Sequence, residues 1–302
     1  MQTLLKYLSA GALSLVSLGA LSSAPAIAAS IIVTSTDGTA PTDYLVYDAN
    51  GTNTFEVAKT LANIQNVLGG DAASPTGNVE LRARTEKPEF DPTKPEFDPT
   101  AFTKNTTLSG AIGGKSITLS SLTASDWATA NYNDSGKTFG KYWFDQALTN
   151  NGLSAVVGTP TADAIFGSFV SNGGFQRFSD PNISYVNQND TTGLISIGLA
   201  GHYDATSLLF AVVPSNLQPL LAGKTIQASE LVKYTYDGQS GYLFSFSATQ
   251  TGLVELKDKV SHSGNYEVTL RPVPVPAAFV GIAIAGAIGA AKLKRSKVTI
   301  KA

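Results

Sequence analysis

The sequence predicts an α+β fold, with β-strands at both ends of the folded body and amphipathic helices between them. Two observations support this prediction. Short segments with period-two alternation are concentrated in residues 31–84 and 231–270, whereas apolar side chains in the middle of the chain recur at helical spacing. The 302 residues, 43% of them hydrophobic, suffice for a sizeable core, so we expect a single domain over residues 29–271.

The individual elements follow from periodicity and from the residues that end it. Asp-Gly, Asn-Gly and Gly-Gly dipeptides separate the alternating segments, and Pro160 is a typical first residue of a helix. The expected strands lie at residues 31–33, 44–47, 79–84, 106–110, 115–119, 231–236, 242–247 and 265–270. The expected helices lie at residues 55–68, 139–148, 160–170 and 205–213. The buried aromatic positions of these helices are expected to serve the core.

The N-terminus has the features of a secretory signal peptide. Lys6 precedes an apolar stretch at residues 8–21, which is followed by the small residues Ala26 and Ala28 at the spacing of a cleavage site. We expect cleavage after Ala28 or Ala29, and therefore export. An uncleaved membrane anchor is the alternative, but the apolar stretch is short for a span of about 20 residues.

The C-terminus carries a second apolar segment. Residues 277–291 contain no charged side chain and are followed by a basic tail that begins at Lys292. As a helix this segment would measure about 22 Å, which is short for a bilayer core of about 30 Å unless flanking residues extend it. The basic tail would remain cytoplasmic and the body would lie outside, in agreement with the signal peptide.

The motif Pro274-Val275-Pro276, the apolar helix and the basic tail resemble, in this order, the PEP-CTERM sorting signal of bacterial envelope proteins. The resemblance implies recognition by an exosortase-type membrane enzyme and transfer to the cell surface or release. Val275 stands where the motif has glutamate, which bears on processing more than on membrane insertion. A permanent membrane anchor is the alternative outcome.

The heptapeptide KPEFDPT occurs twice in succession, at residues 87–93 and 94–100. Its prolines remove backbone donors and favour extended geometry, so the segment cannot be a helix interior or a central strand. Phe90 and Phe97 could form two identical docking anchors. A tandem duplication that an exposed loop tolerates explains the same observation, because loop insertion costs little stability.

Composition excludes several classes of function. The chain has no cysteine, which excludes disulfides, thiolate metal sites and cysteine nucleophiles. The two terminal segments hold six of the 21 basic residues, so the body retains 15 against 23 acidic residues and carries a net charge of −8. A surface this acidic is a poor partner for nucleic acid. No cofactor is expected.

A second resemblance covers most of the body. The stretches at residues 141–145, 174–186 and 194–204 resemble a family of cyanobacterial PEP-CTERM proteins. This supports a location in the envelope and a cyanobacterial source, and it implies no catalytic residue.

Motifs for chemistry are weak. Gly136-Lys137-Thr138 lacks the first glycine of a phosphate-binding loop, and residues 238–242 lack the closing glycine of a nucleophile elbow. His202 is one of two histidines and could act as a general base, although a structural histidine at a strand end is the favoured interpretation. Oxygen-rich residues at 48–52 and 180–190 suit calcium in type but not in spacing, and Asx turns account for both.

Three hypotheses of function remain open. The first is an exported envelope or exopolysaccharide-matrix protein with a structural or interaction role. The second is a carbohydrate-binding module, and the third is a surface hydrolase that uses His202 or a carboxylate pair. The possible ligand contacts, aromatic or titratable side chains near polar loops, are Tyr142, Trp143, Phe175, Phe178, Tyr185 and His202.

Overall fold

The computed structural model describes residues 29–37, 44–81, 103–210 and 213–271. The predicted signal peptide, the duplicated heptapeptide and the sorting motif with its helix at 277–291 lie outside these residues. Among the helices of the described ranges, none has the length and hydropathy that crossing a membrane requires.

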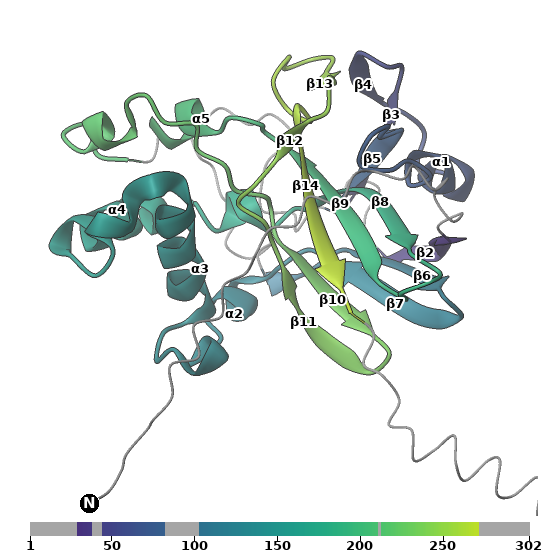
Figure 1. Ribbon diagram of the computed structural model, residues 1–302, viewed down its shortest axis with the longest axis horizontal. Helices are drawn as coiled ribbons and strands as arrows, with labels where there is room; N and C mark the ends of the chain where they lie inside the picture. Colours follow the sequence, from purple (N-terminus) through teal and green to yellow (C-terminus); the bar gives the residue numbers. More distant parts are fainter. Residues whose placement is uncertain (1–28, 38–43, 82–102, 211–212, 272–302) are drawn as a thin grey trace, which may run out of the picture.

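The larger of two sheets contains nine strands within the described ranges, in the order β12-β14-β9-β8-β5-β3-β4-β13 with β1 beside β8 (Figure 1). All pairs are antiparallel except β13 with β4, which run parallel. The strands are β1 (Ala29–Ser30), β3 (Tyr44–Ala49), β4 (Asn53–Glu56), β5 (Gly77–Leu81), β8 (Asn182–Gln188), β9 (Ile195–Gly201), β12 (Thr249–Gln250), β13 (Val254–Glu255) and β14 (Gly264–Leu270).

This sheet curls until its two edges approach each other. The edge strands β12 and β13 are separated in the chain only by residues 251–253. Such a connection reaches at most about 15 Å, far less than the width of a flat sheet of this size. The segment between β13 and β14 bonds to both sides of this connection, because Glu255 N donates to Ser261 O at 2.8 Å and Thr251 N donates to Ser263 O at 3.1 Å.

Five strands form the smaller sheet of the described chain, in the order β11-β10-β7-β6-β2. They are β2 (Ile32–Asp37), β6 (Thr107–Ile112), β7 (Lys115–Ser120), β10 (Val232–Tyr236) and β11 (Gln239–Leu243). Leu108 lies opposite Leu119 in the register, and both are fully buried. They join Val46, Ile183 and Ile197 of the larger sheet in one hydrophobic cluster, so the two sheets enclose a common core.

Helix α1 (Leu61–Val67) covers the edge of the smaller sheet. Its N-cap Thr60 accepts a hydrogen bond from Asn63 N, and Ile64 and Val67 are buried in the common core. The Gln65 amide accepts a hydrogen bond from Val33 N and donates one to Ile31 O. One backbone donor of the edge strand β2 and the carbonyl just before the strand are thereby paired, which covers the start of this edge.

A second hydrophobic cluster lies in the helical lobe, residues 122–178 and 205–231. The lobe contains α2 (Ala124–Trp127), α3 (Phe139–Leu148), α4 (Pro160–Ser171), α5 (Thr206–Phe210) and single helical turns at Tyr132–Asp134, Thr149–Leu153, Ser154–Val156, Gln176–Phe178 and Gln218–Leu221. Threonines cap the two longer helices, since Thr138 Oγ1 accepts from Lys141 N and Thr159 Oγ1 accepts from Ala162 N.

A buried carboxylate joins this lobe to the smaller sheet. Asp126 of α2 accepts hydrogen bonds from Lys233 Nζ and from Tyr242 OH, both at 2.8 Å, and from Thr123 N. Burial by itself would raise the pKa of Asp126, but the bonds from Lys233, Thr123 and Tyr242 outweigh it and hold the pKa below its usual value. The lobe is therefore fixed to β10 and β11 by an ionised group.

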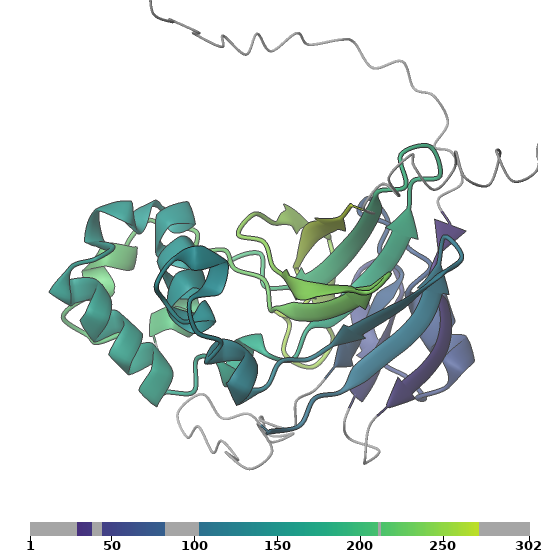
Figure 2. The same ribbon diagram turned by 90° about the horizontal axis from the view of Figure 1, so that it is seen from below.

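The two ends of the folded body lie at the same end of the larger sheet. Ala29 pairs with Gln188, Gln188 pairs with Ile195, and Ile195 pairs with Leu270. Three strand spacings separate the first residue from the last, about 14 Å. Helices α2 and α5 follow the other ends of β7 and β9, so the helical lobe lies at the end of the body remote from Ala29 and Leu270 (Figure 2).

The predicted mixture of helices and strands is confirmed, with strands at both ends of the described region, but two local predictions are corrected. The predicted helix at 55–68 is strand β4 up to Glu56 and helix only over α1, because β4 pairs with β3 and β13. The predicted strands on either side of Asp37-Gly38 are present as β2 and β3, in different sheets. Between the helices, β8 and β9 form the centre of the larger sheet, so the middle of the chain is not only helical.

Candidate functional site

The structure separates the predicted contact residues into three places. Trp143, Phe175 and Phe178 belong to the helical lobe. Tyr185 lies in β8 of the larger sheet, and His202 follows the end of β9. These side chains therefore do not form one binding surface, and each group has its own surroundings.

The aromatic side chains of the helical lobe cover one another. The Phe175 ring stacks on Trp127 with a centroid distance of 4.4 Å, and Phe178 lies 4.7 Å from Trp143. Trp143 is 2% exposed. Tyr142 packs against Tyr132 at 5.2 Å. A carbohydrate platform requires an open ring face, and most of these rings serve the packing of the lobe instead.

Tyr185 is a buried residue of the larger sheet. Its hydroxyl donates to Glu267 Oε2 at 2.9 Å and accepts from Asn265 Nδ2 at 3.3 Å. The ring packs over Gly198, where an added Cβ would lie 2.2 Å from a ring carbon. Burial raises the pKa of this phenol. Tyr185 is thus a hydrogen-bonded structural side chain of the sheet.

Both histidines of the chain lie at the junction of the sheet edges. His262 is 5% exposed, its Nδ1 lies 2.6 Å from Thr54 Oγ1, and its ring meets Tyr47 edge-on. His202 Nε2 lies 3.5 Å from Ser261 Oγ, whose proton is donated to Asp258. Burial lowers the pKa of His262 to about 4, with Asp258 acting against the shift and His202 adding to it.

The contacts of this junction support a structural role. A serine nucleophile requires an imidazole that accepts its hydroxyl proton. Here the Ser261 hydroxyl is bonded to the Asp258 carboxylate, and 3.5 Å is long for a bond to His202. Burial also lowers the pKa of His202, although Asp258 opposes the shift. His262 therefore holds the segment between β13 and β14 against β4 through Thr54, and the Asp258 carboxylate orders the same segment through Val260 and Ser261.

The oxygen-rich segments form Asx turns. Asn50 Oδ1 accepts from the backbone of Thr52 and Asn53, and Asn189 Oδ1 accepts from Thr191 and Thr192. Across the described ranges, no group of three or more histidine, cysteine, aspartate or glutamate side chains is arranged to hold a metal ion. These amide oxygens are used within the turns.

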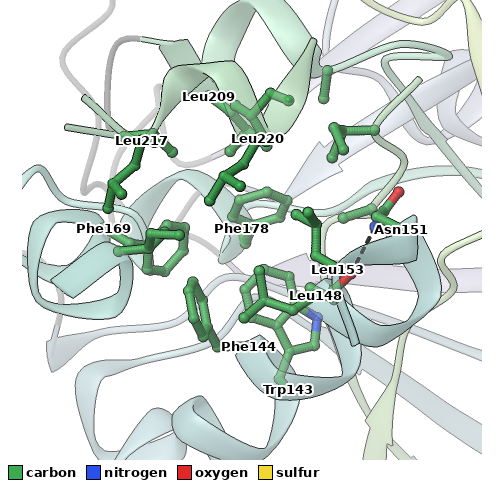
Figure 3. Close-up of a pocket in the computed structure, with 17 residues that line it drawn as sticks. Trp143, Phe144, Leu148, Asn151, Leu153, Phe169, Phe178, Leu209, Leu217 and Leu220 are labelled. Carbon is green, nitrogen blue, oxygen red and sulfur yellow. Dashed lines mark hydrogen bonds between the residues drawn. The ribbon is translucent and has the colours of Figure 1, made fainter. Parts of the chain in front are cut away.

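The helical lobe contains an apolar pocket of about 60 Å³ (Figure 3). Helix α3 contributes Trp143 and Phe144, α4 contributes Phe169, and Leu209, Leu217 and Leu220 lie on the opposite wall. Two polar side chains reach it, Trp143 and Asn151. The Asn151 amide is fully occupied, because it donates to Ala147 O and Gln227 O and accepts from Gln227 N.

Sequence reasoning identified Trp143 and Phe178 but missed the leucines of the opposite wall. The apolar periodicity of residues 205–213 indicated a helix, yet no local signal indicates that Leu209, Leu217 and Leu220 face α3. The pairing of His262 with Thr54 joins residues 208 positions apart and has no sequence signature.

Comparison with known proteins returned no matching family model, no matching curated protein and no matching solved structure.

Proposed function

We propose that this chain is an exported cell-envelope protein, sorted through its C-terminal signal and held at the surface or released into an exopolysaccharide-rich matrix, where it has a structural or interaction role. The proposal rests on the leader with Ala26 and Ala28 and on the motif Pro274-Val275-Pro276 with its apolar segment and basic tail. An exosortase-type enzyme is the partner that this signal requires.

The observation that supports the proposal most is the common exit of both flanking segments. Ala29 and Leu270 lie on strands separated only by β8 and β9, at the same end of the sheet. The turns between β6 and β7, between β8 and β9, and between β10 and β11 lie at this same end. Gly113 of the first turn lies against Gln188, and Lys115 beside it forms an ion pair with Asp237 of the third turn. A body tethered through residues 272–302 would therefore present its helical lobe away from the membrane.

The absence of cysteine is compatible with export, because folding outside the cell then requires no disulfide formation. The two hydrophobic clusters are held without any disulfide, so the body needs no oxidising catalyst to fold after export. The acidic surface is compatible with a hydrated matrix and disfavours binding to anionic lipid.

Intact-mass measurement of the protein from separated cytosolic, membrane, surface and medium fractions of its host tests the proposal. We expect an N-terminus near Ala29, with a C-terminus near Pro276 in the surface or medium fraction or a retained tail in the membrane fraction. The double variant Ala26→Phe with Ala28→Phe should block cleavage, so the leader stays attached to the protein. The control variant Ser22→Phe with Ser23→Phe should still be cleaved. An intact leader on cytosolic wild-type protein would overturn the proposal.

A further inference from the structure

We propose that Asn50 is a site of spontaneous deamidation in the folded protein, where the backbone nitrogen of Gly51 displaces the side-chain amide as ammonia. The sequence contains three asparagines that precede glycine, namely Asn50, Asn151 and Asn172. They differ in how their side-chain amides are bonded, and only Asn50 is left ready to react. This inference concerns the folded body and does not depend on how the protein is sorted.

The reaction needs no reagent other than water. The Gly51 nitrogen attacks Asn50 Cγ, the bond from Cγ to Nδ2 breaks, and the proton from the Gly51 nitrogen leaves with Nδ2 as ammonia. A cyclic succinimide remains, and water opens it at either carbonyl to give aspartate or isoaspartate. One water is consumed for each ammonia released. Glycine favours ring closure, because it has no Cβ and allows the necessary backbone rotation.

The Asn50 side chain is polarised for this attack. Its Oδ1 accepts hydrogen bonds from Asn53 N at 2.9 Å, from Thr52 Oγ1 at 3.1 Å and from Thr52 N at 3.2 Å. Donors at this oxygen stabilise the negative charge that Oδ1 gains when Cγ is attacked. The oxygen of the amide is therefore bonded in the way that an oxyanion requires.

The leaving group and the nucleophile are both unrestrained. Asn50 is exposed in the turn between β3 and β4, and within the described ranges neither its Nδ2 nor the Gly51 nitrogen takes part in a hydrogen bond. The surroundings of Gly51 are open, since a Cβ added there would meet nothing within 4 Å. Nothing has to move away before the ring closes.

The amide of Asn151 is held in place. Its Nδ2 donates to Ala147 O (Figure 3) and to Gln227 O, both at 2.9 Å. Its Oδ1 accepts from Gln227 N at 2.7 Å. Both bonds of Nδ2 must break before ammonia can leave, so the folded structure protects this site.

Asn172 is protected at both reacting groups. Its Nδ2 donates to Ser168 O at 2.7 Å, which holds the leaving group. The Gly173 nitrogen, which would attack, donates to Val170 O at 3.1 Å. The end of helix α4 therefore opposes the reaction.

Isoaspartate at position 50 would weaken the pairing of β4 with both of its neighbours. It routes the main chain through the side-chain carbon and so adds one atom to the turn. Asn50 N donates to Asn53 O at 3.0 Å, and Thr52 O accepts from Val254 N at 3.1 Å. A longer turn shifts Thr52 and Asn53 relative to these partners. The isoaspartyl form should therefore unfold at a lower urea concentration than the unmodified protein.

Peptide mapping by mass spectrometry, after incubation of the full-length protein in mildly alkaline buffer, tests the proposal. Deamidation appears as the mass gain from exchange of an amide for an acid, and isoaspartate as a second peptide of equal mass. In the folded protein Asn50 should react at least roughly tenfold faster than Asn151 and Asn172, whose hydrogen bonds must break first. In urea the three rates should become similar, because each asparagine precedes glycine.

A matched pair of variants tests the role of Oδ1. Thr52→Val keeps the side-chain shape but removes the Oγ1 donor, and it should slow the reaction of Asn50 roughly two- to tenfold. Thr191→Val, in the exposed turn of Asn189, should leave that rate unchanged. An unchanged or faster reaction in Thr52→Val would refute activation through Oδ1. Equal rates at the three sites in the folded protein would overturn the proposal as a whole.

Discussion

His262 should make the stability of the protein depend on pH between about 4 and 6.5. Its ring is 5% exposed and neutral, with a pKa lowered from 6.5 to about 4 by burial. Between pH 4 and 6.5, His262 is therefore protonated in the unfolded chain but remains neutral in the folded protein. The difference of 2.5 pKa units corresponds to roughly 3 kcal/mol, which is present above pH 6.5 and lost as the pH falls to about 4.

His262→Asn is a suitable perturbation. The residue has φ +64°, a left-handed conformation that asparagine tolerates better than most side chains, and the amide can retain a bond to Thr54. Free energies of unfolding are measured in urea between pH 4 and 7.5 by tryptophan fluorescence, for wild type and variant. Because Asp126 and Asp258 also titrate with lowered pKa values, the readout is the difference between the two pH profiles.

Wild type should lose roughly 3 kcal/mol more than the variant between pH 7 and 4, most of it below pH 6.5. His202, whose pKa burial also lowers, remains in both proteins, so only its coupling to His262 differs between them. Parallel profiles would refute the reasoning, since they would mean that His262 is protonated in the folded state without cost.

Four further predictions concern packing, hydrogen bonding and the segments outside the described residues. Gly198→Ala should destabilise by about 1–3 kcal/mol in urea unfolding, because its Cβ would overlap the Tyr185 ring, whereas Gly167→Ala in α4 meets nothing within 4 Å and should stabilise by up to about 1 kcal/mol. Ser179→Ala should lower the free energy of unfolding by about 1–3 kcal/mol, because it leaves the buried Trp127 indole N–H unpaired. The surface variant Ser125→Ala is the control, and a loss for Ser179→Ala no larger than that of the control would contradict the prediction. Deletion of residues 87–93 should change the free energy of unfolding by less than about 1 kcal/mol, and a large loss in calorimetry would show that the repeat is packed. Val275→Glu should increase the fraction of C-terminally processed protein in surface fractions by mass, whereas Val273→Glu should not.

Local elements were predictable where a single short-range signal decides the structure. The strands β6 and β7 flank Gly113-Gly114, both with positive φ, as the glycine pair indicated. Helix α3 covers residues 139–148 and α4 begins at Pro160, because spacing, a threonine cap and a proline at the first turn all agree. Helical spacing misled at Phe55, where the partner strands β3 and β13 impose extended structure on residues of ambiguous preference.

The candidate sites were predictable only in part. Trp143, Phe175 and Phe178 were identified as aromatic residues near loops, but their burial depends on neighbours such as Trp127 and Phe169 that local sequence does not assign. His202 was placed correctly after a strand. Its position beside Ser261, Asp258 and the second histidine depends on the closure of the sheet.

The sequence by itself determined the mixture of strands and helices and many of the turns between them, and it predicts the addresses at the two termini, since each depends on composition or on residues within one turn of each other. Tertiary structure alone decided which sheet each strand joins, that β12 and β13 bring the sheet edges together, and that α3, α4 and α5 enclose an apolar pocket. Those features arise from contacts between side chains that lie far apart in the chain. The periodicity of apolar residues shows that one face of a strand or helix is apolar, but it does not show which element packs against that face.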